Sequence, residues 1–140
     1  MAQKLSVGPF QFFSTGVRVV GKPELNVWKG PLQFAYWCQR AGPWWIGDMI
    51  NAGEDQFGES FAQLGEGGIS TEMLSRYAAV ARRVPIQNRR PGLSWSAHAQ
   101  VAKLPVDRQR AVLQQAEREG WDTVQIRDRV KELLKTAKAE

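Results

Sequence analysis

Apolar residues recur at helical spacing along much of the chain, most clearly between residues 70 and 84. The apolar positions of this segment are three and four residues apart: Leu74, Tyr77, Val80 and Ala81. Residues at that spacing share one face of a helix, so this face needs a core to lie on. Ser70 is placed to cap the helix. Pro85 ends it near Val84, because the residue before a proline avoids the α region.

The opposite face of the same segment is polar or basic. Its side chains are Thr71, Glu72, Ser75, Arg76, Ala79, Arg82 and Arg83. Residues 54–64 predict a preceding helix with apolar Phe57, Phe61 and Leu64, and Gly65–Gly68 predicts a turn between the two. This order is typical of a helix-turn-helix, although the turn is longer and richer in glycine than usual. The segment 70–84 is therefore a candidate DNA-reading helix.

The first third of the chain is aromatic. Apolar and polar residues alternate between residues 7 and 21, which predicts a β-hairpin with its turn at Ser14-Thr15-Gly16. A helix is expected from Pro23 to Gly42, with Pro31 in the first turn of its main segment. Gly42-Pro43 should break that helix, and a further helix should follow to about residue 53. Apolar groups on most sides predict a helix buried on more than one face. The four tryptophans are better explained as core than as a base-stacking platform: Trp28, Trp37, Trp44 and Trp45.

Three further helices are predicted after Pro91-Gly92. Ser94 caps a short one to about residue 102, a second runs from about residue 104 to 118 before Gly120, and Asp122 caps the last. The apolar stripe of the last helix comprises Ile126, Val130, Leu133 and Ala137. This stripe either packs on the core of the monomer or forms the interface of a dimer. The predicted fold is mainly α, a multi-helix bundle with a helix-turn-helix and a small N-terminal β-hairpin. We expect one domain over 1–140, divided into hairpin 1–22, aromatic helices 23–53 and helical region 54–136.

The positive charge is concentrated in about a quarter of the chain, whose net charge is +5. Residues 73–106 carry six basic side chains and no acid, whereas residues 1–72 balance to −2 and residues 107–140 to +1. Such a concentration indicates a phosphate-binding face, and the alternative is a solvated arginine-rich loop. The expected contacts to DNA bases are Thr71, Glu72, Ser75 and Arg76. The expected contacts to DNA phosphates are Arg82, Arg83, Arg89, Arg90 and Lys103.

Enzyme chemistry has little support in the sequence. Cys38 is the only cysteine and His98 the only histidine, so four such ligands for zinc cannot come from one chain. Gly65-Glu66-Gly67-Gly68 lacks the Gly-Lys-Ser/Thr ending of a phosphate-binding loop. We expect no catalytic residue, metal or cofactor. The lone cysteine and the lack of an apolar run of about 20 residues favour a cytosolic protein with no membrane partner.

The order of motifs from about Phe61 to Leu134 resembles the helical DNA-binding domain of ParB-type partition proteins. After the helix-turn-helix, Leu93-Ser94 and His98-Ala99-Gln100-Val101 follow the pattern L-S-x-x-H-A-x-x-L. Leu104-Pro105 comes next, and Gly120–Ile126 resembles a G-L-S-V-R-E-L pattern. Trp44–Asp48 is similar to a segment of small LmbU-like bacterial and phage regulators. The resemblance implies the fold and DNA binding. It does not extend to a CTP-binding partition domain, so a sliding-clamp partition protein is not expected.

These features favour a DNA-binding transcriptional regulator whose partner is double-stranded DNA. Since one helix-turn-helix reads only a few base pairs, we expect either a homodimer or a second subunit supplied by a partner. The seam of a homodimer is either the last helix or the hairpin with Phe10, Phe12 and Phe13. The alternative function is that of a phage or mobile-element protein that modulates transcription by binding host RNA polymerase or a sigma factor with the same basic face.

Overall fold

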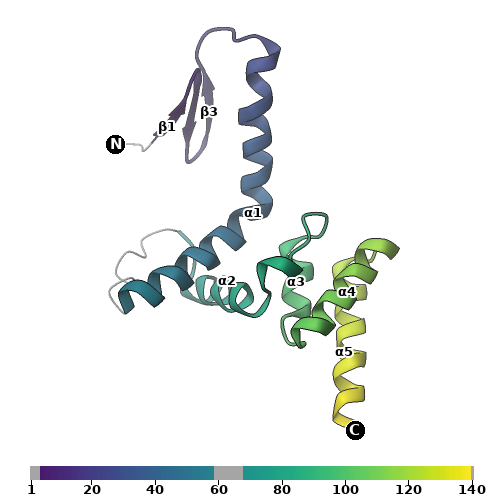
Figure 1. Ribbon diagram of the computed structural model, residues 1–140. Coiled ribbons are helices and arrows are strands. Elements are labelled where there is room, and N and C mark those ends of the chain that lie inside the picture. The colour runs from purple at the N-terminus through teal and green to yellow at the C-terminus, as the bar shows by residue number, and fades with distance from the viewer. Residues whose placement is uncertain (1–3, 59–67, 140) are drawn as a thin grey trace. The chain divides into compact units, whose positions relative to one another are not determined.

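The protein is mainly helical with a small N-terminal sheet, as expected (Figure 1). The computed structural model describes residues 4–58 and 68–139. These form two compact units, Met1–Arg40 and Ala41–Glu140. We call them the N-terminal unit and the C-terminal unit. The division between these units falls near residue 40. The segment boundaries expected after residues 22 and 53 were drawn within a single domain.

The N-terminal unit contains an antiparallel sheet of three strands among its described residues. They are β1 (Lys4–Val7), β2 (Phe10–Phe13) and β3 (Gly16–Val19), in that order across the sheet. Strands β2 and β3 are the predicted hairpin, with Phe12 opposite Val17. Strand β1 was not predicted, and Gly8, at φ +55°, lies in the turn that joins it to β2. Phe10 is buried, and its ring meets the edge of Trp28 at 5.0 Å between centroids.

Helix α1 (Leu25–Phe57) is one continuous helix of 33 residues. The predicted start at Pro23 lies two residues before the observed one, whereas the predicted place of Pro31 in a first turn and the predicted break at Gly42-Pro43 are wrong. A proline inside a helix removes one hydrogen bond and costs about 3 kcal/mol, which contacts made elsewhere can offset. Residues after Pro43 have such contacts, because Asp48 and Asn51 bind groups more than 25 residues away.

The helix predicted over residues 54–64 is only partly described. Glu54–Phe57 form the last turn of α1, and Gly58 follows at φ +60°. Phe61, Leu64 and Gly65–Gly67 lie outside the described residues. The first helix and the turn of the predicted helix-turn-helix therefore remain predictions.

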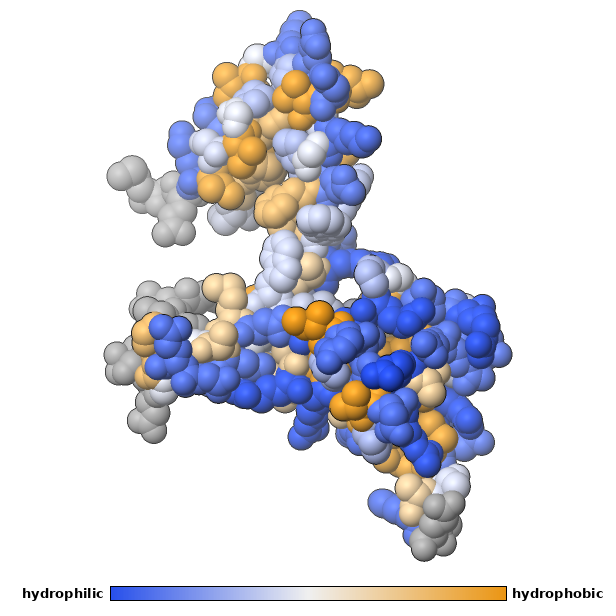
Figure 2. Space-filling model, viewed as in Figure 1, coloured by the Kyte–Doolittle hydropathy of each residue, from blue (hydrophilic) through white to orange (hydrophobic). Residues whose placement is uncertain are grey.

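The aromatic segment of α1 differs most from expectation. Within Leu25–Arg40 only Pro31 is partly buried, and Trp37 is 60% exposed. The predicted burial of this segment on more than one face is wrong, because the described chain places no second layer over it. Of the four tryptophans, Trp44 is partly buried and packs against a buried cluster, whereas Trp28, Trp37 and Trp45 are exposed. Figure 2 shows apolar residues on the surface of the N-terminal unit, whereas hydrophilic residues dominate this face of the C-terminal unit.

The described C-terminal unit continues with α2 (Thr71–Arg83), the 3-10 helix η2 (Ile86–Asn88), α3 (Trp95–Val101), α4 (Val106–Glu119) and α5 (Thr123–Ala139). The predicted caps are confirmed. Ser70 Oγ accepts a hydrogen bond from the N–H of Met73, and Ser94 Oγ accepts one from that of Ala97. Asp122 and Gln125 each accept the other's backbone N–H at 2.8 Å, so α5 begins with a capping box. Gly120, at φ +68°, ends α4.

Helices α3, α4 and α5 enclose the main core. Its buried members are Ala97, Val101, Leu104, Val112, Leu113, Ala116, Ile126 and Val130. Leu133 packs against this cluster from α5. The apolar stripe of α5 therefore closes the core of the monomer, which was one of the two roles predicted for it, and only Ala137 at its end is exposed.

Candidate nucleic-acid interface

Helix α2 separates its two faces as the sequence predicted. Val80 and Ala81 are buried, and Leu74 and Tyr77 are partly buried. All seven positions on the opposite face are exposed: Thr71, Glu72, Ser75, Arg76, Ala79, Arg82 and Arg83. Glu72 lies in the first turn, and the two terminal arginines lie in the last, where each charge suits the helix dipole. The four residues expected to contact bases therefore share one accessible surface.

Arg76 is exposed but not isolated. Its guanidinium carbon lies 5.4 Å from the centre of the Trp95 ring, at the start of α3. Trp95 in turn meets Tyr77 edge-on at 5.1 Å. This stack gives Arg76 a preferred direction through a cation–π contact, which is worth about 0.5–1 kcal/mol at an exposed site. An arginine held in this way loses less conformational entropy when it binds a ligand.

Arg82, Arg83 and Lys103 are the basic side chains best able to reach a phosphate. Arg82 binds Asp55 at 2.9 Å, but both side chains are more than half exposed, so this pair contributes only about 0–1 kcal/mol. The side chains of Arg83 and Lys103 are exposed and make no ion pair with any other described residue. Their charges are available to a ligand.

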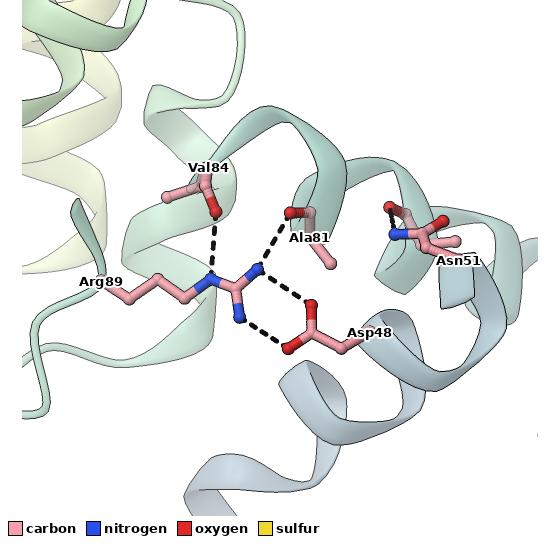
Figure 3. A network of polar contacts seen from close by, with 6 residues as sticks. Asp48, Asn51, Ala81, Val84 and Arg89 are labelled. Atoms are coloured by element: carbon pink, nitrogen blue, oxygen red, sulfur yellow. Dashed lines mark hydrogen bonds and ion pairs between the residues drawn. The ribbon is translucent and has the colours of Figure 1, made fainter. Parts of the chain in front are cut away.

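Arg89 has an internal role that the sequence did not reveal (Figure 3). Its guanidinium forms a two-pronged ion pair with Asp48, at 2.8 and 3.0 Å. It also donates to the carbonyls of Ala81 and Val84, at 2.9 and 3.0 Å. These carbonyls belong to the end of α2, where the helix offers them no partner. The centre of the Trp44 ring lies 4.1 Å from the guanidinium carbon, and only 14% of the Arg89 side chain is exposed. The guanidinium therefore stabilises the fold.

Arg90 and His98 form a second junction. The Arg90 guanidinium binds Glu117 at 2.7 Å and is about one-third exposed. The Arg90 backbone N–H donates to His98 Nε2 at 2.9 Å, so that nitrogen is unprotonated, and Nδ1 donates to the Ser94 carbonyl at 2.7 Å. Burial lowers the pKa of His98 below 6.5, aided by the nearby positive charges of Arg89 and Arg90. His98 is therefore a neutral structural residue.

A buried amide pair also supports the end of α2. The Nδ2 group of Asn88 donates to Gln109 Oε1 at 3.2 Å, and both side chains are buried. Gln109 Nε2 donates to the carbonyls of Arg83 and Leu104 at 2.9 and 3.0 Å. Gln109 is therefore a buried polar residue of α4. No local pattern distinguishes it from Gln114, which is exposed, or from Gln115, which is partly buried, because two of its partners, Arg83 and Asn88, lie far from it in the sequence.

The second half of α1 fixes α2 from the other side. A Cβ at Gly47 would collide with the Tyr77 carbonyl, so only glycine allows this close approach of the two helices. Asn51 Nδ2 donates to the Ala78 carbonyl at 2.9 Å. The signal that could have indicated these contacts is the segment Trp44–Asp48, which supplies Trp44, Gly47 and Asp48 to the site.

The described residues lack a metal-binding cluster and a membrane-spanning helix. The described residues contain no group of three or more histidine, cysteine, aspartate or glutamate side chains able to hold a metal ion. Within the same residues, no helix has both the length and the hydrophobicity needed to cross a membrane.

One curated protein gives a clear match to the chain. It is the transcriptional regulator NovE of Streptomyces niveus, 29% identical over 113 residues, which cover 74% of this chain and 52% of the relative. The chain therefore spans about half the length of this relative. No protein-family model matches the chain, and no solved structure does. The similarity supports a relationship to transcriptional regulators, while the resemblance to the ParB-type domain remains a prediction.

Proposed function

We propose that this protein is a transcriptional regulator that binds double-stranded DNA through the exposed face of α2. The observation that carries the proposal is the surface that places Thr71, Ser75 and Arg76 beside Arg82 and Arg83. An α-helix fits the major groove, and the side chains of its exposed face can reach base edges there. The similarity to a transcriptional regulator supports the same reading. Such a protein would act in the cytoplasm, where the DNA is.

The contacts divide by chemistry. Arg76, held over Trp95, is suited to pair with guanine O6 and N7, while Thr71, Glu72 and Ser75 offer shorter polar groups for neighbouring bases. The phosphate contacts would come from the basic side chains of Arg82, Arg83 and Lys103. Arg90 would have to break its ion pair with Glu117 to reach a phosphate. Arg89 is not part of the proposed interface, since its guanidinium holds α2 to α1.

The proposal is tested by fluorescence anisotropy on two duplex probes, a site selected from a random library and an unselected pool. We expect the double variant Arg83→Ala with Lys103→Ala to weaken binding to both probes and to reduce the salt slope by about two. Arg76→Ala should lose about 1–3 kcal/mol on the selected site and much less on the pool.

The matched control is Lys131→Ala with Lys135→Ala, two exposed lysines of α5. It removes the same charge away from α2, so affinity and salt slope should stay close to those of the parent protein. If the control and the α2 variants weaken binding equally, DNA binds by net charge alone and the proposed face is wrong. If no DNA is bound while RNA polymerase or a sigma factor is, the alternative function replaces this one.

A further inference from the structure

One arginine beside η2 plays no part in the DNA-binding face described above. Arg110 is exposed on α4, and its Nε donates to Asn88 Oδ1 at 3.2 Å. We call the place where η2 meets the first turns of α4 the η2–α4 corner. Arg110 lies outside the acid-free stretch 73–106, so counting charges along the chain does not single it out. Its position becomes notable only through the contacts at this corner.

Two buried amides fix the direction of the Arg110 side chain. Gln109 Nε2 donates to two backbone carbonyls, which can only accept, so its Oε1 is left to face Asn88. Asn88 Nδ2 donates to this oxygen at 3.2 Å and to the Val106 carbonyl at 2.9 Å. The other polar atom of the Asn88 side chain is Oδ1, an acceptor, and this residue is only 2% exposed. The fold therefore presents a buried acceptor to Arg110 and holds its guanidinium by one N–H.

The rest of the guanidinium is available to a ligand. Nη1 and Nη2 of Arg110 have no hydrogen-bond partner or ion pair among the described residues. Asp107, the nearest carboxylate in the sequence, lies about 60° away around α4 and does not pair with it. Arg89 and Arg90 differ, because each is engaged by a carboxylate. An anchored arginine without a counter-ion loses little freedom on binding and breaks no ion pair.

Arg110 continues a line of basic side chains that begins on α2. Arg83 follows Arg76 by about two helical turns, so the two side chains leave nearly the same side of α2. The Arg83 carbonyl accepts from Gln109, the residue before Arg110. Through this network the Arg110 Nε lies within about 14 Å of the Arg83 carbonyl oxygen. One DNA strand presents a phosphate about every 3.4 Å of helix axis, so a few nucleotides span the two residues.

We propose that Arg110 binds a phosphate of the DNA backbone, so that the contact with DNA extends from α2 to the η2–α4 corner. The inference rests on the proposed function and adds a site to it. A backbone phosphate is the ligand that fits, because it offers two anionic oxygens to the two Nη groups of a forked guanidinium. Such a contact positions α2 on the duplex and carries no sequence information itself.

The test uses the full chain and the same two duplex probes, with anisotropy measured at several salt concentrations. The informative variant is Arg110→Gln, because glutamine Nε2 stands where arginine Nε does and can still donate to Asn88. We expect it to weaken binding to both probes about three- to tenfold and to reduce the salt slope by about one. Arg110→Lys keeps the charge and should restore most of the salt slope.

The matched control is Arg108→Gln. Arg108 is exposed on the same helix, about 160° around α4 from Arg110, so the same change removes the same charge on the other flank. Its affinity and salt slope should stay close to those of the parent protein. Circular dichroism of each variant establishes that it is folded, since a purely structural role of Arg110 would lower stability and leave the salt slope of the folded protein unchanged.

The outcomes separate this site from the proposed function. A parental salt slope in Arg110→Gln overturns the inference, as does an Arg110→Lys protein that restores none of the slope or an Arg108→Gln protein that is weakened as much. If Arg83→Ala with Lys103→Ala lowers the slope while Arg110→Gln does not, α2 binds DNA and only the η2–α4 corner is wrong. If the parent protein binds neither probe, both proposals fail.

Discussion

The two units use similar apolar residues in opposite ways. Leu113 of the C-terminal unit is fully buried, whereas Leu32 of the N-terminal unit is 50% exposed, although both lie in helices. In the C-terminal unit α3, α4 and α5 cover one another's apolar sides. In the described N-terminal unit one helix meets a sheet of three four-residue strands, which is too small to cover it. Burial is thus decided by whether a second layer exists and not by the residue itself.

The glycines of α1 show the same difference. Gly47 lies where the backbone of α2 touches α1, and the fold of the C-terminal unit requires it. Gly30 faces open space, and nothing described in its own chain requires it. Gly47 is therefore explained by a contact within the C-terminal unit, whereas Gly30 is not.

The largest expected contrast is between the two leucines. Leu113→Ala should lower the free energy of unfolding by about 3 kcal/mol, because it leaves a cavity in a closed core. Leu32→Ala should change it by no more than about 0.5 kcal/mol in dilute protein, as at other surface sites. Urea unfolding followed by circular dichroism measures both. Equal losses would show that the N-terminal helix is buried in solution, and the comparison between the units would fail.

The next contrast concerns the two glycines. We expect Gly47→Ala to cost about 1–3 kcal/mol, because the added methyl group forces α1 and α2 apart. Gly30→Ala should instead stabilise dilute protein by about 0.5–1 kcal/mol through better helix propensity. The same urea titrations apply. A harmless Gly47→Ala would mean that the second half of α1 does not pack closely on α2.

The smallest effect is a pH dependence that arises in the C-terminal unit. Because His98 has a lowered pKa in the folded protein, the unfolded chain takes up a proton first as the pH falls below 6.5. Stability should therefore decrease from pH 6.5 downward, with a slope of at most about 1.4 kcal/mol per pH unit from this group. His98→Gln removes the titrating group, so its unfolding free energy should depend less on pH between 6.5 and 5. An unchanged slope in this variant would show that His98 does not titrate as described.

Local signals in the sequence determined the helices of the C-terminal unit. Ser70, Ser94 and Asp122 cap helices where predicted, and Gly120 ends one in the left-handed conformation. The face of α2 that carries Arg76 was also predictable. Capping and helical periodicity involve residues a few positions apart, so a short stretch of sequence contains the whole interaction.

Contacts between distant segments were decided only by the tertiary structure. Arg89 was expected on a phosphate, but its ligands are Asp48, 41 residues before it, and two carbonyls of α2. Gln109, a polar residue of α4, is buried because Asn88, Arg83 and Leu104 present matching groups. The helix break expected at Pro43 does not occur, and Asp48 and Asn51 anchor the helix beyond it.

The sequence by itself therefore determined where most helices begin and end and which side of α2 is polar. Tertiary structure alone decided which arginines are structural, which tryptophans are exposed and whether a proline breaks a helix. The physical reason is that propensity and capping energies are local, whereas burial and ion pairing depend on groups that folding brings from elsewhere in the chain.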